Sequence, residues 1–298
     1  MGDYVFDPDD PDISKLAVGK GVKRLAVCRA DVDNLGKAFI SGFEQDSDNE
    51  EERYRFVTLS RTATFSRLMS VFFRYYINLL LSQNRYRLNI VYSGGDDVFL
   101  IGNWSDVINV AVGLRNAFKK YCGGALTLSA GIGIFPEKFP VAMAARSTAE
   151  LEDKAKAFVD PATGRAKDAV CFFSPEDVYT FSWDQWETDV RAKIKQLSEL
   201  FNYQKSAQDA NTVLRGKSML YRILELLRGA DDKINIARYA YMLARLAPDG
   251  KADETYKNIY DRFQKNMYQW ILSEQDRKSL MLAILIYVYS VRESGGNQ

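Results

Sequence analysis

The sequence predicts an α+β fold: a palm-like sheet of the ferredoxin type with an inserted hairpin, followed by an all-α helical bundle. Through about residue 180, apolar runs suited to strands alternate with amphipathic segments, in the order strand, helix, hairpin, helix, strand, helix, strand. From about Ser182 onward only helical apolar spacing remains. We therefore expect a flexible lead-in over 1–20, a palm domain over 21–180 and a C-terminal helical domain over 181–298.

The lead-in is expected because its start is acidic, rich in Asp and Pro, and lacks an apolar period. The first strand is expected over 22–30, and a long helix over 56–81 whose apolar stripe should face the core. That stripe is Phe65, Leu68, Phe72, Tyr76 and Leu79.

Two apolar runs, 88–92 and 98–101, are typical of the arms of a β-hairpin. The remaining palm elements are a helix over 106–121 that stops at Gly123 and Gly124, a strand over 126–135, a helix over 140–158 and a strand over 169–173. The five bundle helices are expected over 183–204, 212–228, 233–246, 253–272 and 277–292.

The composition describes a soluble globular protein, with 47% hydrophobic and 27% charged residues. A formal net charge of +1 gives no global basic field, so any contact with a polyanion must be local. The three cysteines, Cys28, Cys122 and Cys171, show no metal-ligand spacing and indicate reduced thiols in a cytoplasmic protein. The longest apolar run, 280–289, is about half of what a bilayer span needs, so no membrane partner is expected.

The sequence contains no histidine. This excludes histidine-based metal hydrolysis, serine or cysteine triads that depend on histidine, and imidazole-ligated haem or zinc. Chemistry in this chain must therefore use carboxylates, metal and backbone groups.

The tip of the hairpin is Gly94-Gly95-Asp96-Asp97. Glycines allow backbone conformations that other residues resist and let another group come close. Adjacent carboxylates disfavour joint ionisation unless a cation lies between them, and oxygen ligands favour Mg²⁺ or Mn²⁺ over zinc. The alternative is an ordinary solvated turn, since Gly-Gly-Asp is common hairpin chemistry.

A second acidic cluster, Asp31 and Asp33, follows the first strand. Strand alternation would place both on one face, and a carboxylate at the end of a buried strand is costly without a partner. If the hairpin is the neighbouring strand, Asp31 lies beside Asp96, and the three acids can share metal ions. The alternative role of an N-cap suits Asp33 better than Asp31.

The run 30–36 (Ala-Asp-Val-Asp-Asn-Leu-Gly) followed by Ser93-Gly94-Gly95-Asp96-Asp97 resembles the catalytic GGDD palm of the large subunit of type III CRISPR effector complexes, specifically the Csm-type subunit of type III-A. The resemblance covers roughly residues 20 to 175, and the helical tail matches in kind that family's C-terminal domain. It implies a palm related to nucleotide cyclases and polymerases, and a chain that corresponds to a C-terminal portion of the subunit.

The resemblance implies a nucleotidyltransferase of an antiviral ribonucleoprotein that converts ATP to cyclic oligoadenylates. The 3′-hydroxyl of one ATP would attack the α-phosphate of another, with pyrophosphate leaving and two Mg²⁺ or Mn²⁺ ions assisting. The implied partners are ATP, the other subunits of the complex, and CRISPR RNA and target RNA held through the complex. The family's nuclease domain and its other palm have no counterpart in these residues, so activity of the chain alone is not expected to be complete.

Residue by residue, the resemblance assigns the metal ligands to Asp31, the Val32 carbonyl, Asp96 and Asp97. Gly94 and Gly95 would leave room for the nucleotide, and Ser93 would reach its phosphates or ribose. The resemblance also assigns residues that bind the nucleotide. The turn amides of Asn34, Leu35 and Gly36, together with Lys156, would hold the phosphates. Phe39 would stand where guanine-specific relatives have an asparagine, which favours adenine.

Other interpretations stay open. Lys156 is also explained as a solvent-facing charge at a helix end. The chain as a whole could be a GGDEF-type homodimeric cyclase that makes a cyclic dinucleotide, which predicts a preference for GTP and a symmetric dimer. It could also be a non-catalytic scaffold whose helical bundle docks on a ribonucleoprotein.

Overall fold

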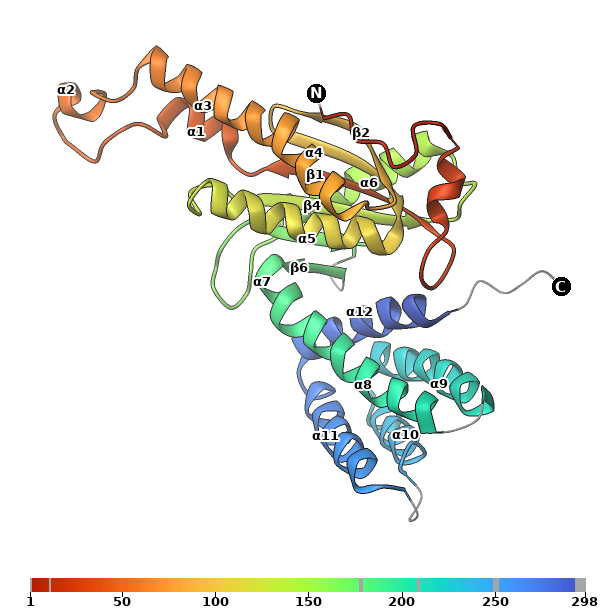
Figure 1. Ribbon diagram of the computed structural model, residues 1–298. Helices are drawn as coiled ribbons and strands as arrows, with labels where there is room; N and C mark the ends of the chain where they lie inside the picture. The colour runs from red at the N-terminus through yellow and green to blue at the C-terminus, as the bar shows by residue number, and fades with distance from the viewer. Residues whose placement is uncertain (1, 11, 177–178, 208–209, 249–251, 293–298) are drawn as a thin grey trace. The chain divides into compact units, whose positions relative to one another are not determined.

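The computed structural model describes residues 2–10, 12–176, 179–207, 210–248 and 252–292. The chain divides into two compact units, residues 1–183 and 184–298. The first is a mixed α+β unit and the second is helical (Figure 1). The predicted fold class, a palm-like sheet followed by a helical region, is confirmed.

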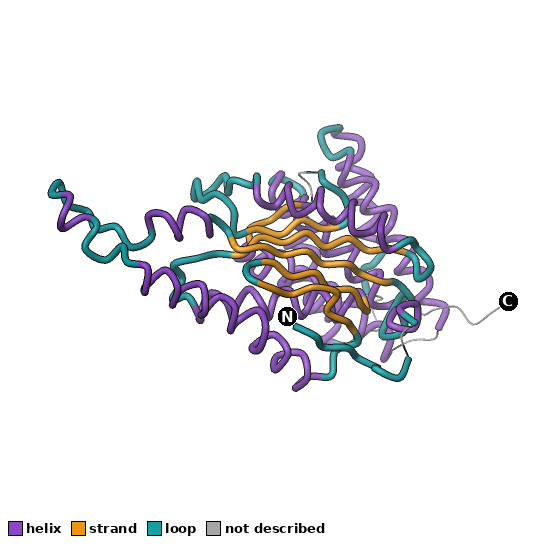
Figure 2. Tube along the Cα trace, turned by 90° about the horizontal axis from the view of Figure 1, so that it is seen from above, coloured by secondary structure: helices purple, strands orange, loops and turns teal. Residues whose placement is uncertain are grey.

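A six-stranded sheet forms the centre of the first unit, in the order β2-β3-β1-β4-β5-β6 (Figure 2). Neighbouring strands are antiparallel except for β4 and β5, which are parallel. The two central strands are therefore β1, the first strand of the chain, and β4, which follows the hairpin and a helix. The bounds are β1 (Leu25–Val32), β2 (Leu88–Gly94), β3 (Asp97–Asn103), β4 (Leu128–Phe135), β5 (Ala169–Phe172) and β6 (Thr180–Ser182).

Helices cover both faces of this sheet. On one face, α5 (Trp104–Tyr121) packs beside the segment of α3 (Leu59–Val71), η2 (Phe72–Tyr76) and α4 (Ile77–Asn84), through contacts such as Phe73 with Phe118. On the other face α6 (Val141–Lys156) packs against β1 and β4, and its Ala144 joins Val27 and Ile101 in an apolar cluster. Two short helices, α1 (Leu35–Ser41) and α2 (Glu50–Arg53), follow β1 (Figure 1).

The helical segment before the hairpin buries a different stripe from the predicted one. Leu68, Tyr76 and Leu79 are 44%, 40% and 53% exposed, whereas the buried residues recur every four positions, at Met69, Phe73, Ile77 and Leu81, with Phe72 beside them. A π-helical turn, η2, interrupts the segment and winds more loosely than an α-helix, and the spacing of four residues continues through it. The predicted core stripe is therefore wrong for three of its five residues.

The described residues 2–10 and 12–17 differ from the expected flexible lead-in. The Gly2 amide donates to the Ser93 carbonyl at 3.1 Å, the Ile90 amide donates to the Tyr4 carbonyl at 2.9 Å, and Val5 forms an antiparallel bridge with Asn89. A short 3₁₀ helix, η1 (Ile13–Ala17), then buries Leu16 and Ala17 against Leu25. The backbone pairing covers the free edge of β2, which an acidic composition alone does not reveal.

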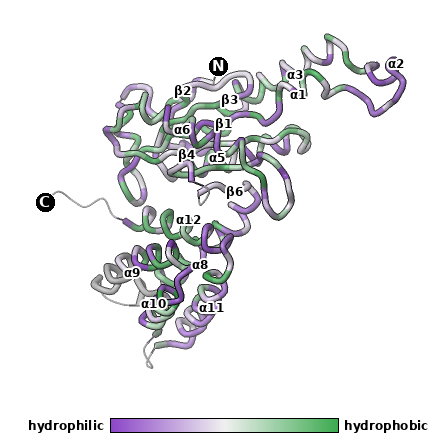
Figure 3. The backbone as a smooth tube through the Cα atoms, turned by 180° about the vertical axis from the view of Figure 1, so that it is seen from behind, coloured by the Kyte–Doolittle hydropathy of each residue, from purple (hydrophilic) through white to green (hydrophobic). Residues whose placement is uncertain are grey.

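The second unit contains α7 (Trp183–Gln185, which begins in the first unit), η4 (Trp186–Val190), α8 (Arg191–Ala207), α9 (Ala210–Arg228), α10 (Lys233–Ala244), α11 (Glu254–Trp270) and α12 (Glu274–Val291). Figure 3 shows the apolar character of α12, which packs with α8 and α9. Lys193 pairs with Asp276 at 2.8 Å and thereby connects α8 to α12. Among the described helices, none combines the length and the hydropathy needed to cross a membrane.

Candidate functional site

The predicted hairpin is present, and its tip is a two-residue turn. Gly94 at the end of β2 pairs with Asp97 at the start of β3, which leaves Gly95 and Asp96 in the turn. Gly95 has a φ of +44°, a conformation that favours glycine, and a side chain built there would meet nothing within 4 Å. The tip is therefore open to a ligand on the side of Gly95.

The hairpin brings its acids to the end of β1, as predicted. In the antiparallel register of β1 and β3, Asp31 lies directly opposite Asp97, and the Val32 amide donates to the Asp96 carbonyl at 3.1 Å. The neighbour of Asp31 across the strands is thus Asp97, whereas the sequence analysis placed Asp96 there. The two-residue turn decides this, because it makes Asp97 the first residue of β3 and leaves Asp96 at the tip.

Asp97 has the electrostatic environment of a carboxylate that lacks a counter-ion. Its Oδ1 is buried without a hydrogen-bond partner among the described residues. Burial, and then the charges of Asp96 and Asp31, raise the pKa of the Asp97 carboxyl, while a hydrogen bond from Tyr92 lowers it. The charge of Asp97 in turn raises the pKa of the Tyr92 phenol. A cation at Asp97 would relieve these costs.

The donor set therefore fits a hard divalent cation. Asp31 and Asp97 supply carboxylate oxygens from paired positions, with Asp96 and the Val32 carbonyl beside them in the chain. In the part of the chain that the structure describes, no group of three or more His, Cys, Asp or Glu side chains is gathered closely enough to hold a metal ion. Two carboxylates and backbone oxygen, rather than three carboxylates, are thus the ligands that this arrangement offers.

Lys156 lies in the site. Its Nζ is 3.0 Å from Asp31 Oδ2 and 2.7 Å from Glu152 Oε1. Burial by itself lowers the pKa of Lys156, but the hydrogen bonds and charges of Glu152 and Asp31 outweigh it and raise that pKa. The solvent-facing alternative for Lys156 is therefore wrong in this structure, because the side chain is 30% exposed and bound to two acids.

Ser93 is not positioned for the expected contact with phosphate or ribose. It is fully buried, and its hydroxyl donates to the Phe73 carbonyl in the π-helical turn. Ser93 pairs with Val98, one position from Asp97, so strand alternation turns Ser93 to the face of the sheet opposite the acids. The side chain therefore satisfies a carbonyl of η2 rather than facing the hairpin tip.

The turn after β1 lies at the start of α1, a helix of seven residues. Asn34 has a φ of 57°, and its Oδ1 accepts from Lys167 Nζ at 2.8 Å. Leu35 is buried, whereas a side chain built on Gly36 would meet nothing within 4 Å. Phe39 stacks at a tilt on Phe65, with the ring centroids 4.8 Å apart, so it belongs to a small aromatic cluster beside this turn.

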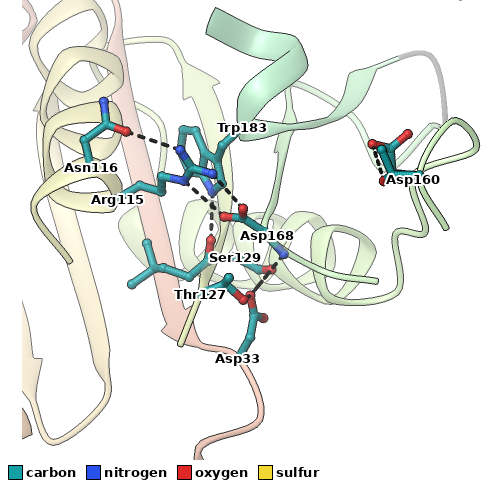
Figure 4. Close-up of polar contacts among 10 residues, drawn as sticks. Asp33, Arg115, Asn116, Thr127, Ser129, Asp160, Asp168 and Trp183 are labelled. Carbon is teal, nitrogen blue, oxygen red and sulfur yellow. Dashed lines mark hydrogen bonds and ion pairs between the residues drawn. The ribbon is translucent and has the colours of Figure 1, made fainter. Parts of the chain in front are cut away.

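Asp33 has a structural role that neither sequence interpretation anticipated (Figure 4). It is 2% exposed, and its Oδ2 accepts from Thr127 Oγ1 at 2.7 Å, Ser129 Oγ at 3.0 Å and the Asp168 amide at 3.1 Å. Burial raises the pKa of this carboxyl against the effect of those bonds. The N-cap of α1 is Asn34, so Asp33 is neither the cap nor a partner of Asp31.

Asp168, which contacts Asp33, also forms a bidentate ion pair with Arg115 of α5 (Figure 4). The distances are 3.0 Å from Nε to Oδ1 and 2.6 Å from Nη2 to Oδ2. The Arg115 side chain is 6% exposed. This network ties the loop before β5 to the turn after β1 and to α5.

Sequence reasoning missed three residues of the site. Tyr92 hydrogen-bonds Asp97, Glu152 pairs with Lys156, and Arg29 Nε donates to Glu152 Oε2 at 2.9 Å. Signals existed for two of them. Arg29 is two residues before Asp31 on one strand face, and Glu152 precedes Lys156 by four residues on one helix face.

The sheet order, the open hairpin and the acids at the end of β1 define a palm-domain protein. The chain belongs to the Cas10/Cmr2 family of CRISPR proteins. Residues 24–170 match the family described as Cas10/Cmr2, second palm domain, and residues 199–293 match the CRISPR RNA silencing complex Cmr2 subunit, second helical domain. The resemblance stated from the sequence is thereby confirmed.

Relatives named CRISPR system single-strand-specific deoxyribonuclease Cas10/Csm1 (subtype III-A) match nearly the whole chain. The Streptococcus thermophilus protein is 43% identical over 98% of this chain, and the Mycobacterium tuberculosis protein is 37% identical over 98%. The chain spans only 36% and 34% of those proteins, about a third of their length. A crystal structure of Csm1 from T. onnurineus matches with a TM-score of 0.65 and 24% identity over 98% of this chain and 40% of that one, which supports the fold.

Proposed function

We propose that this chain is the ATP-binding palm and adjoining helical domain of a type III-A CRISPR large subunit, and that it takes part in converting ATP to cyclic oligoadenylates. The observation that carries the proposal is the pairing of Asp31 with Asp97, whose Oδ1 is buried without a partner among the described residues. Such a carboxylate pair favours a bound divalent cation, and a palm with this cation has the chemistry of a nucleotidyltransferase.

In this proposal Asp31, Asp97 and the Val32 carbonyl hold Mg²⁺ or Mn²⁺, and Asp96 at the hairpin tip adds its negative charge beside them. When bound, the metal would lower the pKa of the attacking 3′-hydroxyl and neutralise charge on the α-phosphate, so that pyrophosphate can leave. Asp31 and Asp97 orient the cation from two paired strands, which fixes their relative position more firmly than a loop would.

The other site residues would bind and orient ATP. Gly94 and Gly95 carry no side chain, and a Cβ built on Gly95 would meet nothing within 4 Å, which leaves room for the nucleotide on that side of the hairpin tip. Lys156 would exchange its contact with Asp31 for the triphosphate, which is a stronger anion. The amides of Asn34, Leu35 and Gly36 would bind phosphate oxygens, and Phe39 would border the adenine. Ser93 is left out of this proposed binding, because its hydroxyl donates to the Phe73 carbonyl.

Solved structures with this fold include a Csm1-Csm4 cassette in complex with one ATP and another in complex with cA4. By analogy, the partners of this chain would be ATP, the other subunits of the effector complex, and CRISPR RNA with target RNA through that complex. The assembly would be cytoplasmic. Its palm would act with the other palm of the full subunit, so the chain alone binds nucleotide without completing the reaction.

Thermal unfolding of the chain with ATP, GTP or no nucleotide, in Mg²⁺ and in EDTA, tests the proposal. A ligand that binds only the folded state raises the melting temperature. At a ligand concentration of about a hundred times Kd, the free energy of unfolding increases by about 2.7 kcal/mol. We expect a metal-dependent shift with ATP that is lost in the Asp96→Ala/Asp97→Ala variant. A larger shift with GTP would favour a GGDEF-type cyclase, and no shift with either nucleotide would favour a scaffold.

A further inference from the structure

Lys156 is shared between two carboxylates of different character. Asp31 belongs to the proposed metal site, whereas Glu152 lies on the same helix as Lys156, one turn away. The Glu152 side chain is 9% exposed, and each of its oxygens has a cationic partner: Oε1 accepts from Lys156 and Oε2 from Arg29. Glu152 is therefore a buried carboxylate that needs these cations and holds them in place.

The position of Glu152 is set by the close approach of α6 to β4. A Cβ built on Gly131 of β4 would lie 2.4 Å from the Glu152 amide nitrogen and 2.7 Å from the Thr148 carbonyl oxygen. Only glycine allows this spacing, because both of those atoms belong to the helix backbone. The same spacing places the last turn of α6, and with it Lys156, within reach of Asp31 on the adjacent strand β1.

An ammonium group and a divalent cation compete for the charge of Asp31. Both would neutralise the same carboxylate, and like charges at contact distance repel. Binding of a metal at Asp31 is therefore favoured when Lys156 moves away from it, and Glu152 is the described residue that already holds Lys156 by a second bond. Without the charge of Glu152, Lys156 would have only Asp31 as an anionic partner and would compete more strongly with the metal.

We propose that Glu152 is a positioning residue that sets how strongly Lys156 competes with a divalent cation for Asp31. This inference rests on the proposed function, because it takes Asp31 as a metal ligand. In the absence of metal Lys156 neutralises Asp31, and when metal binds Glu152 retains Lys156 beside the site. In this structure its ammonium group is 2.7 Å from Glu152 Oε1, and this bond would keep Lys156 near the site for an incoming phosphate.

The test measures the affinity of the chain for Mn²⁺ without nucleotide. Electron paramagnetic resonance reports the concentration of free Mn²⁺ at each point of the titration. We expect Lys156→Met to tighten Mn²⁺ binding by about three- to tenfold, because the competing charge is gone. We expect Glu152→Gln to weaken it by a similar factor, about three- to tenfold, because Lys156 then pairs with Asp31 alone. The exposed Glu150→Gln on the same helix is the matched control and should bind as the wild type does.

The double variant Lys156→Met/Glu152→Gln separates positioning from simple loss of charge. If Glu152 acts through Lys156, the double variant binds Mn²⁺ as tightly as Lys156→Met. The inference is overturned if Glu152→Gln weakens Mn²⁺ binding equally in the wild-type chain and in Lys156→Met, or if it weakens binding in neither. Circular dichroism of each variant confirms that it is folded.

Asp31→Asn in the same assay distinguishes this inference from the proposed function. Loss of Mn²⁺ binding in Asp31→Asn, together with no effect of Glu152→Gln, would overturn the role of Glu152 and leave the metal site standing. If the wild-type chain binds no Mn²⁺, or if Asp31→Asn binds Mn²⁺ as well as the wild type does, both the role of Glu152 and the proposed metal site are overturned.

Discussion

Asp31 of β1 and Asp97 of β3 are direct cross-strand partners at the end of the sheet where the hairpin turns. Two like charges directly opposite each other destabilise an antiparallel pair. The chain therefore carries an electrostatic cost at the position where the proposed function needs a cation. That cost leads to predictions that separate stability from binding.

Asp97→Asn should stabilise the metal-free chain at neutral pH. The pKa of Asp97 is raised in the folded state above the ordinary value of 3.8, so ionisation costs more in the folded chain than in the unfolded one. The free-energy penalty of ionising Asp97 in the folded chain is absent below pH 3.8. It grows as the pH rises from 3.8 to the folded-state pKa, and it is fully present above that pKa. In EDTA, the melting temperature of Asp97→Asn should exceed that of wild type at pH 7.

The difference between the two chains should shrink as the pH falls toward 4, because wild-type Asp97 then takes up a proton. Melting curves of both proteins across this range measure it. A difference that stays constant with pH would show that the gain comes from packing rather than from the charge of Asp97.

Ser93→Ala should lower stability and leave nucleotide binding intact. The substitution removes the hydroxyl that donates to the Phe73 carbonyl, and a buried carbonyl left without that donor costs about 1 to 2 kcal/mol. Urea unfolding measures the loss, and the ATP-dependent thermal shift in Mg²⁺ should keep its wild-type size. If the shift disappears while the chain remains folded, the hydroxyl contacts the nucleotide after all.

Gly131→Ala should separate α6 from β4. The new Cβ would lie 2.4 Å from the Glu152 nitrogen and 2.7 Å from the Leu151 Cβ, so the helix must shift. We expect a loss of about 1 to 3 kcal/mol in the free energy of unfolding and a weaker ATP-dependent shift, because Lys156 moves with α6. Gly113→Ala in α5 is the control, because a Cβ at this position would meet nothing within 4 Å. Replacing this helical glycine by alanine should stabilise the chain by about 0.5 to 1 kcal/mol.

Arg115→Met should destabilise the first unit by about 2 to 3 kcal/mol, because it leaves Asp168 without its bidentate partner in a half-buried position. Arg53→Met offers a comparison. Arg53 pairs with Glu44 at 3.1 Å but is 50% exposed, and an exposed pair of this kind contributes less than about 1 kcal/mol. Equal losses for the two variants in urea unfolding would contradict the structural role of the Arg115–Asp168 pair.

Much of the fold could be read from local patterns. The strand over 22–30 appears as Leu25–Val32, the helix over 106–121 as Trp104–Tyr121, and the helix stop at Gly123 and Gly124 coincides with φ values of +59° and +80°. Such segments are predictable because their apolar period and their glycines act over a few residues. The hairpin and its acidic tip are predictable for the same reason.

The features that the sequence analysis missed depend on contacts between distant segments. The π-helical turn at Phe72–Tyr76 lies in the segment whose buried residues differ from the predicted stripe, and no local sequence pattern indicates it. The edge pairing of Tyr4 and Val5 with β2 depends on backbone groups, which composition does not report. Asp33 looked like a helix cap, but Thr127 and Ser129 on β4 supply the hydrogen bonds that decide its role.

The sequence by itself determined which chemical groups the proposed site can offer: carboxylates and glycines at a hairpin tip, an acid at a strand end, and no histidine. It also determined the family, because those residues occur together in order. Only the tertiary structure decided that Asp97 rather than Asp96 lies opposite Asp31, that Ser93 faces away from the acids, and that Glu152 shares Lys156 with Asp31. Register and helix-to-sheet spacing set these three relationships, and both arise from packing between segments far apart in the chain.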